Sequence, residues 1–357
     1  MLQRQGFQPM LARTAKGLFA LLIGFAGGYL FWRVGLPLPW MTGAMVFAAI
    51  AALVGLPASP PDPLQPPMLA VVGTMLGASF SMAFFVGLAS AAVPLAGLLA
   101  SAATGSFLAY LMLRRVAGLS PQTAYFSAMP GGVIEMVLMA RERGGDEMVV
   151  ALVHASRIFF VVLCLPFILE WVTGMHAARG TGITVTLADV GALDVVWFAG
   201  VVAAGFVLSK LVNLPARFMF APMIASTFVH VMGWTDFKLP FELIAAAQVV
   251  IGAGIGSRFG NVGNQRILHT LGLSVVVTAT LTSAAVAAAA VVHQISGIEL
   301  ASLILSYAPG GLGEMSLIAL AMGFDVAFVV GNHLVRLILV ITGAALIFDR
   351  LRLGSRS

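Results

Sequence analysis

The chain has 357 residues, of which 60% are hydrophobic and only 9% are charged, and its mean hydropathy is +1.02. A soluble domain carries about 25% charged residues, so this composition excludes an ordinary globular surface and indicates that a lipid bilayer surrounds most of the molecule. The net charge of +5 is modest, and the sequence has neither a basic helix with interleaved aromatic residues nor zinc-finger spacing, so we expect no nucleic-acid partner.

Twelve apolar stretches follow one another along the chain, and most are long enough to span a hydrocarbon core of about 30 Å. They cover residues 17–34, 39–56, 67–86, 88–113, 121–141 and 147–172, and then 194–211, 216–233, 241–259, 268–293, 299–322 and 325–348. The first stretch follows Arg4, Arg13 and Lys16 but is not followed by a small-residue cleavage site. It is therefore expected to be a membrane helix and not a signal peptide.

The chain repeats itself at an offset of 179 residues. Ser127-Ala-Met-Pro-Gly-Gly-Val-Ile-Glu-Met136 returns as Ser306-Tyr-Ala-Pro-Gly-Gly-Leu-Gly-Glu-Met315. The same gapless offset joins Gly73, Gly77, Asp146, His154 and Arg157 to Gly252, Gly256, Asp325, His333 and Arg336. Such a repeat divides the chain into two homologous halves. The predicted organisation is a cytoplasmic tail (1–16), a first membrane repeat (17–175), a linker (176–193), a second membrane repeat (194–349) and a second cytoplasmic tail (350–357).

The fifth stretch of each half is predicted to be broken, because proline lacks a helix donor and two glycines lower helix propensity. It forms either a discontinuous helix that crosses the membrane or a re-entrant hairpin. A hairpin leaves five crossings per half and makes the two halves inverted. With a cytoplasmic amino terminus, most arginines and lysines then lie inside, and only Arg33, Arg179 and Lys238 lie outside. The positive-inside rule therefore favours the inverted arrangement.

The two breaks are the strongest candidates for a substrate site, because matched interruptions in two halves mark transporter sites. The free amide groups of the second half-helix attract an anion, and carbonyl groups of the first can hold Na⁺. The alternative is a pair of structural kinks. The candidate substrate-binding residues here are Ser127, Pro130, Gly131, Gly132, Ser306, Pro309, Gly310 and Gly311.

Matched ionisable residues follow each break. Glu135 and Glu314 are intramembrane carboxylates that could bind a proton or Na⁺, or could simply balance the helix dipole or pair with an arginine. His154 and His333 could relay protons or hydrogen-bond a neighbouring helix. We predict that these four residues couple the ion.

Arg157 and Arg336 lie near the middle of the sixth stretch, where snorkelling to the membrane surface is difficult. Each needs a glutamate, a group of carbonyls or a carboxylate substrate as its partner. Asn332 has only Val153 as its counterpart, which indicates asymmetric use of the two halves. We predict substrate contact for Arg157, Arg336 and Asn332, with a structural salt bridge as the alternative for the arginines.

Glycines at a four-residue spacing mark two further segments. Gly73 and Gly77, like Gly252 and Gly256, form small-residue faces that let membrane helices approach closely. The alternative is an unwound stretch beside the site, to which Thr74 and Gln248 could add polar contacts.

The doubled Pro-Gly-Gly-x-x-Glu-Met motif, together with Pro-Trp-Met-Thr-Gly-Ala at 39–44, resembles the AbrB family of bacterial membrane proteins. The resemblance runs from about residue 17 to residue 348. This family is similar to the sodium/proton antiporter and bile-acid symporter superfamily. The resemblance implies an all-α membrane protein with inverted repeats, core and scaffold domains, elevator-type transport of small organic anions such as carboxylates, and a homodimer.

We therefore expect a secondary active transporter of the inner membrane, coupled to Na⁺ or H⁺, without a cofactor and without enzymatic activity. Family names also mention ammonia monooxygenase and transcriptional regulation, so a membrane metalloenzyme and a membrane sensor or regulator remain alternatives. The six histidines lack metal-ligand spacing apart from a pairing of His154 with His333, and no helix-turn-helix segment is evident.

Overall fold

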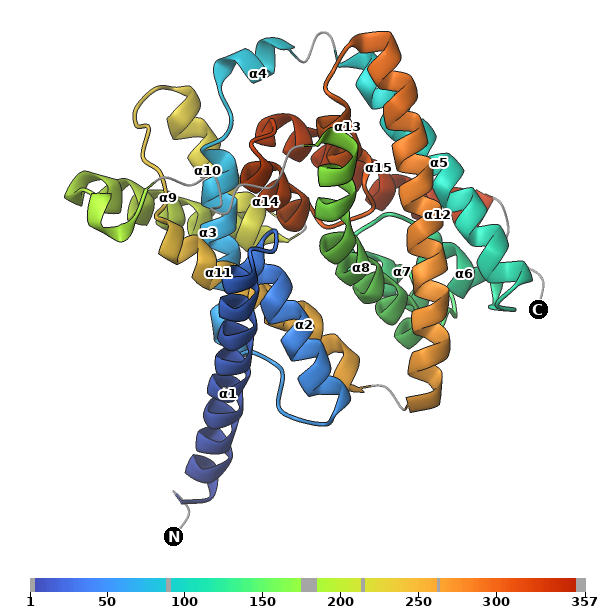
Figure 1. Ribbon diagram of the computed structural model, residues 1–357, viewed down its shortest axis with the longest axis horizontal. Coiled ribbons are helices and arrows are strands. Elements are labelled where there is room, and N and C mark those ends of the chain that lie inside the picture. Colours follow the sequence, from blue (N-terminus) through green and yellow to red (C-terminus); the bar gives the residue numbers. More distant parts are fainter. Residues whose placement is uncertain (1–3, 88–90, 175–184, 213–215, 262–263, 351–357) are drawn as a thin grey trace. The chain divides into compact units, whose positions relative to one another are not determined.

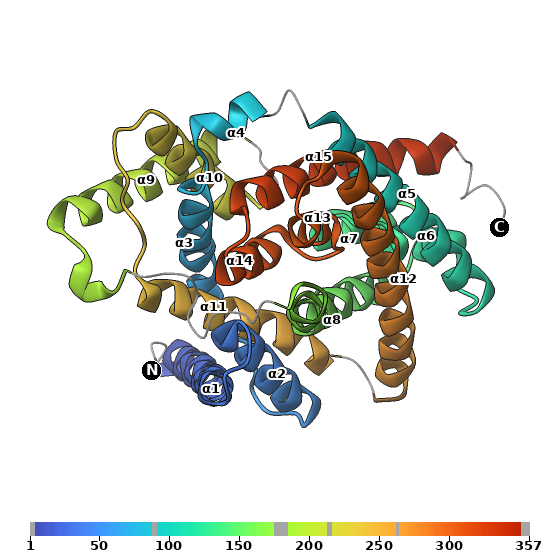
Figure 2. The same ribbon diagram turned by 45° about the horizontal axis from the view of Figure 1, so that its top comes forward.

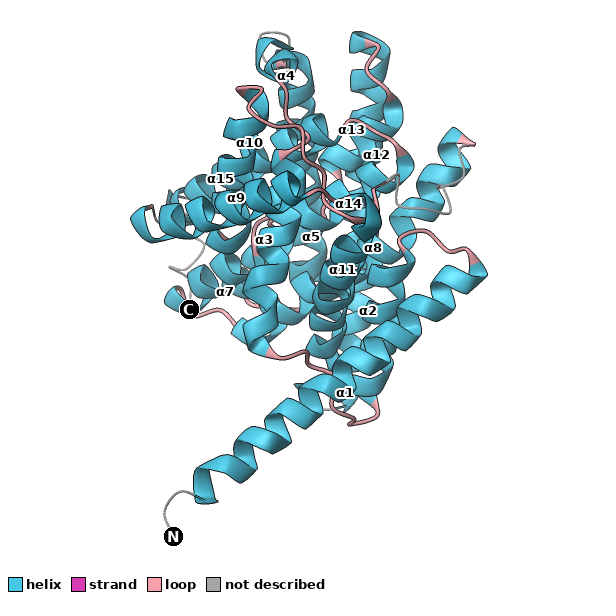
Figure 3. Ribbon diagram, turned by 90° about the vertical axis from the view of Figure 1, so that its left-hand side faces the viewer, coloured by secondary structure: helices cyan, strands magenta, loops and turns pink. Residues whose placement is uncertain are grey.

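The computed structural model describes the backbone of residues 4–87, 91–174, 185–212, 216–261 and 264–350, and the side chains of these residues except 4–14 and 261–269. All regular structure in this part of the chain is helical (Figure 3). Part of the predicted linker, 176–184, and the tail from 351 onward lie outside the described residues, as does Arg179. The helices group into two compact units.

The first unit contains seven α-helices among its described residues. They are α1 (Arg4–Val34), α2 (Pro39–Leu53), α3 (Gln65–Gly77), α4 (Met82–Gly87), α9 (Ala192–Leu211), α10 (Arg217–Val231) and α11 (Phe241–Gly256). Short 3₁₀ turns occur at Asp62–Leu64, Leu187–Asp189 and Ser257–Asn261.

Glycines allow the helices of the first unit to pack closely. A Cβ atom on Gly73 or Gly77 of α3 would collide with the carbonyl oxygen of Met219 or Met223 on α10. On α11, Gly252 and Gly256 have the same relation to Met41 and Met45 of α2. The small-residue interpretation of these glycines is confirmed, and each face packs on a helix from the other half of the sequence.

The second unit contains α5 (Ala92–Arg115), α6 (Pro121–Ala128), α7 (Val133–Glu142), α8 (Glu147–Thr173), α12 (Asn264–Ser296), α13 (Leu300–Tyr307), α14 (Leu312–Met322) and α15 (Val326–Arg350). Residues 320–322 of α14 group with the first unit. Helices α5 and α12 lie side by side (Figure 1).

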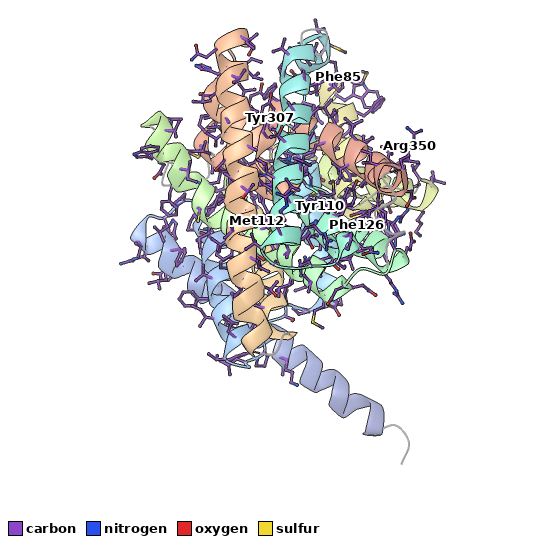
Figure 4. All side chains as sticks on the ribbon, turned by 90° about the vertical axis from the view of Figure 1, so that its right-hand side faces the viewer. Phe85, Tyr110, Met112, Phe126, Tyr307 and Arg350 are labelled. Atoms are coloured by element: carbon purple, nitrogen blue, oxygen red, sulfur yellow. The ribbon has the colours of Figure 1, made fainter. Side chains whose placement is uncertain are left out.

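A buried apolar cluster joins α5, α6, α8 and α12 in the second unit. Leu113 of α5, Ala124 and Ala128 of α6, Val153 of α8 and Leu281 of α12 belong to it. Tyr110 and Met112, labelled on α5 in Figure 4, pack against this cluster. Burial of these side chains fixes α6 against α8 and so positions the segment that follows α6.

Seven of the described helices are long and apolar enough to cross a membrane, and they make the chain a multi-pass membrane protein. They are α1, α5, α8, α9, α11, α12 and α15. Helices α2, α3 and α10 have only 15, 13 and 15 residues, fewer than the roughly 20 that a perpendicular crossing needs. The sequence had predicted longer segments at these three places.

Candidate functional site

The fifth stretch of each half is broken at the motif that predicts the break. Helix α6 ends at Ala128 and α7 begins at Val133, while α13 ends at Tyr307 and α14 begins at Leu312. We call residues 129–132 the first break and residues 308–311 the second break. Because a proline nitrogen carries no hydrogen, neither Pro130 nor Pro309 can donate to the carbonyl group four residues earlier.

The chain folds back at the first break. The backbone N–H of Asp146, in the turn after α7, donates to Oγ1 of Thr123 at the start of α6 (2.9 Å). If α6 and α7 continued in one direction, these residues would lie about 30 Å apart. Met136 and Ala140 of α7 also pack with Phe126 of α6 in one buried cluster. The two half-helices therefore lie beside each other.

We expect Thr123→Val to lower the free energy of unfolding by about 1 kcal/mol, because the partly buried hydrogen bond between the N–H of Asp146 and Oγ1 of Thr123 is lost. Thermal denaturation in detergent measures the change. Thr342→Val is the matched control, since Thr342 is exposed and donates only to carbonyl groups of its own helix. Equal losses in the two variants would show that the Thr123 contact does not hold the fold-back.

Each break is capped at its carbonyl end by an arginine. Arg157 of α8 donates from Nη1 to the carbonyl oxygen of Met129 (2.9 Å) and from Nη2 to that of Gly131 (3.4 Å). Arg336 of α15 donates to the equivalent carbonyls of Ala308 and Gly310, and also to that of Tyr307. Among the partners that the sequence left open, backbone carbonyl groups are the ones observed.

The arginines also show which part of α8 and of α15 each break contacts. Arg157 and Arg336 each lie ten residues after the first residue of their helix, which is about 15 Å along its axis. Figure 2 shows α13 and α15 side by side, and the Arg336 contacts join them at this point. Both breaks therefore contact candidate membrane-spanning helices in their interior, away from either end.

Each guanidinium group is almost fully buried, with Arg157 2% and Arg336 6% exposed. Neither lies within 4.0 Å of a carboxylate oxygen among the described residues. Two cations without an ion-pair partner therefore share the interior of the second unit, which favours a nearby negative charge.

Both glycines of the motif make room for side chains that fold back over the break. A Cβ atom on Gly132 would collide with Oε2 of Glu135, and one on Gly311 would collide with Oε2 of Glu314. A Cβ atom on Gly131 would lie 2.9 Å from Cε of Met136. Each glutamate is the third residue of its half-helix, so its carboxylate covers the amide end.

The two histidines bind backbone carbonyl groups in different ways. Nδ1 of His154 lies 2.9 Å from the carbonyl oxygen of Val150 in its own helix. Nε2 of His333 lies 2.9 Å from the carbonyl oxygen of Leu305, the group left without a helical donor by Pro309. A carbonyl oxygen can only accept a hydrogen bond. Nδ1 of His154 and Nε2 of His333 must therefore carry the proton that is donated.

Several buried polar atoms of the second unit lack a hydrogen-bond partner within the described residues. Among them are Oγ of Ser127, Oγ of Ser156, Nε of Arg157, Oδ1 of Asn332 and Nδ1 of His333. Ser156 was not predicted as a site residue, because a lone serine in an apolar helix has no distinguishing pattern. Its counterpart at the 179-residue offset is Val335.

An ion pair joins the turn after α7 to the last described helix of the chain. We call α6, the first break and α7 together the first hairpin. Arg143, in the turn after α7, pairs through two bonds with Asp349 of α15 (3.0 and 2.9 Å). This hydrogen bonding raises the pKa of the Arg143 guanidinium. The hydroxyl group of Tyr125 donates to the carbonyl oxygen of Ala344 on the same helix (2.9 Å). Both contacts join the hairpin of one half to the last helix of the other.

No group of three His, Cys, Asp or Glu side chains suited to a metal ion occurs among the residues whose placement is described. His154 and His333, considered as a pair from the sequence, bind separate carbonyl groups.

Comparison with known proteins identifies similar chains. The sequence profile of the family described as "Transition state regulatory protein AbrB" matches residues 40–352. The "Uncharacterized protein YhjN" of Bacillus subtilis (strain 168) is 27% identical over 348 residues, covering 91% of this chain and 90% of that protein. The "Putative regulator AbrB" of Escherichia coli (strain K12) is 26% identical over 318 residues, covering 88% of this chain and 91% of that protein.

Proposed function

This chain belongs to the AbrB family, and from the two arginine-capped helix breaks we propose that it is a secondary active transporter of a small organic anion such as a carboxylate. The observation that carries the proposal is the pair of breaks, each of which contacts the interior of a candidate membrane-spanning helix through a buried arginine. Broken helices that place their free backbone groups near the middle of the membrane are how many transporters bind ions and substrates.

We infer that the two sequence halves are inverted repeats with five crossings each. The fold-back between Thr123 and Asp146 supports a re-entrant first break, and the seven long helices together with α2, α3 and α10 provide ten segments. The three shorter helices can be accommodated by local thinning of the bilayer. The positive-inside rule then places both termini in the cytoplasm of a bacterial cell and the protein in its inner membrane.

The division into two units supports an elevator mechanism. Both breaks, both arginines and both motif glutamates belong to the second unit. We propose that this unit carries the anion across the membrane, and that the first unit is the scaffold and forms a homodimer. The coupling ion is Na⁺ or H⁺, with Glu135 and Glu314 as its candidate sites. No catalytic role is proposed.

Uptake into proteoliposomes tests the function. We expect saturable uptake of at least one of acetate, lactate, pyruvate and succinate, driven by a Na⁺ gradient or by a pH gradient. Protein-free vesicles and vesicles with heat-denatured protein are the controls. If folded protein takes up none of these anions under either gradient, the proposal fails.

A membrane regulator is the second candidate, and the printed name of the Escherichia coli relative favours it. A regulator without transport needs a partner protein that binds it stably. Absence of uptake together with such a partner, recovered at constant stoichiometry with the purified protein, would support this candidate.

A further inference from the structure

The first break is compensated at both ends by side chains of the protein. At its carbonyl end the Arg157 guanidinium binds the carbonyl oxygens of Met129 and Gly131. At its amide end the Glu135 carboxylate lies over Gly132. The two charged groups neutralise the two opposite helix dipoles, so the break carries no net charge while Glu135 is ionised.

The arginine makes this break a poor site for Na⁺. A sodium ion at a helix break needs backbone carbonyl oxygens as ligands. The oxygens of Met129 and Gly131 already accept from a cation, and a second cation at the same atoms would be repelled at hydrogen-bond distance.

The glutamate likewise prevents an anion from binding at the amide end. An anion there would lie against the Glu135 carboxylate in a partly buried site, where like charges repel more than in bulk water. Protonation of Glu135 removes this charge and allows the carboxyl group to move away from Gly132. The negative charge of the anion then replaces that of the glutamate, and the net charge of the site is unchanged.

The first break also has a buried hydroxyl donor without a partner within the described residues, whose counterpart at the second break is satisfied. Oγ of Ser127 and Nε of Arg157 are buried and have no partner in the described part of the chain, and Arg157 is only 2% exposed. At the equivalent position of the second break, Ser306 donates to the carbonyl oxygen of Ser302 (2.7 Å), and Arg336 donates to three carbonyls. Unpartnered buried donors are costly unless a ligand or water satisfies them.

Resting on the proposed function, we propose that the anion binds at the first break together with one proton on Glu135. Its negative charge faces the amide end of α7, Nε of Arg157 and Oγ of Ser127. The proton comes from solvent and binds a carboxylate oxygen of Glu135. The coupling ion is thus H⁺, one proton is taken up per monovalent anion, and the second break is structural.

Other ionisable groups lie on the elements that pack against α7, namely α6, α8 and α15. They are Tyr125 on α6, Glu147, His154, Arg157, Cys164 and Glu170 on α8, and His333, Arg336, Asp349 and Arg350 on α15. Glu147 lies 3.4 Å from Arg141, and Asp349 pairs with Arg143. The two histidines remain as competing proton sites and are included in the test.

The test is calorimetric titration of the purified full-length protein in detergent, in two buffers that differ in ionisation enthalpy and at several pH values. The probe is whichever of acetate, lactate, pyruvate and succinate raises the thermal stability of the wild-type protein most. We expect uptake of about one proton per bound monovalent anion where Glu135 is ionised, and an apparent Kd that rises about tenfold per pH unit there. Replacing Na⁺ with choline leaves the Kd unchanged.

Variants locate the proton. Glu135→Gln, which resembles the protonated residue, is expected to bind the anion with no proton uptake and a pH-independent Kd. Glu142→Gln, at the exposed end of the same helix, is the control, and Glu314→Gln is the matched change at the second break. Both should retain proton uptake, as should His154→Asn and His333→Asn. Glu135→Asp, which keeps a titratable group, should retain the pH dependence if Glu135→Gln does not fold.

The outcomes separate the two proposals. If no carboxylate binds to the wild-type protein, the transport proposal fails. Binding without proton uptake, binding that requires Na⁺, or proton uptake that is lost in Glu314→Gln or in a histidine variant overturns the assignment of the proton to Glu135, while transport itself stands.

Discussion

Replacement of Gly252 by alanine is expected to destabilise the protein by roughly 3 kcal/mol or more, the upper part of the range for overpacked interiors. The Cβ atom would collide with the carbonyl oxygen of Met41 and would lie 3.2 Å from its carbonyl carbon. Both atoms belong to the backbone of α2, so no side-chain rotation can relieve the contact, and α11 must move away from α2. Thermal denaturation followed by size-exclusion chromatography in detergent measures the loss.

Gly254 provides a matched control on the same helix. A Cβ atom there would meet only Nε2 of Gln65 at 3.6 Å and Cγ of Pro60 at 3.9 Å, which are ordinary van der Waals distances. Gly254→Ala should therefore raise stability slightly, because alanine has a higher helix propensity by about 1 kcal/mol. Similar stability in the two variants would contradict the close α2–α11 packing.

The position of each break could be predicted from the sequence because its causes are local. Proline removes a donor and glycine lowers helix propensity wherever they occur. The partners of Arg157 and Arg336 could not be predicted in the same way. Every residue has a carbonyl group, so a carbonyl partner leaves no mark in the sequence, whereas a carboxylate partner would have been visible as Asp or Glu.

The glycine spacing in the first unit likewise predicted only part of the packing. Gly73 and Gly77 indicate that a helix packs closely, and they do so correctly. They do not identify the partner helix, because its contribution is the backbone of Met219 and Met223. Thus the exchange of packing partners between the two sequence halves became visible only in the structure.

The sequence predicted the difference between the two breaks only in part. Asn332 has Val153 as its counterpart in the first half of the sequence, which indicated that the two halves differ. Oδ1 of Asn332 is indeed buried without a partner among the described residues. The more informative difference is between Ser127 and Ser306, which are identical in sequence. One hydroxyl group donates to a carbonyl of its own helix and the other does not, so a difference in hydrogen bonding, and not in residue type, distinguishes the breaks.

The hydrogen bonds of Arg157 and Arg336 likewise predict different effects when each arginine is replaced by glutamine. Arg336→Gln should lower the yield of folded protein, because the shorter side chain leaves the carbonyl groups of Ala308 and Gly310 without their close donors. The third contact, to the carbonyl oxygen of Tyr307 at 3.5 Å, contributes little. Each buried unsatisfied group costs about 1–3 kcal/mol, and two of them remove a large part of the stability of a typical domain.

Arg157→Gln should instead leave more folded protein and abolish anion uptake. Only the carbonyl group of Met129 loses a close donor, because the bond to Gly131, at 3.4 Å, contributes little. The anion, however, loses the guanidinium group of the first break, whose buried Nε–H has no partner within the described residues. The comparison is made at equal amounts of folded protein, with detergent denaturation curves beside uptake in proteoliposomes. If Arg336→Gln folds normally and loses uptake while Arg157→Gln retains it, the second break is the binding site and the roles assigned to the two halves are reversed.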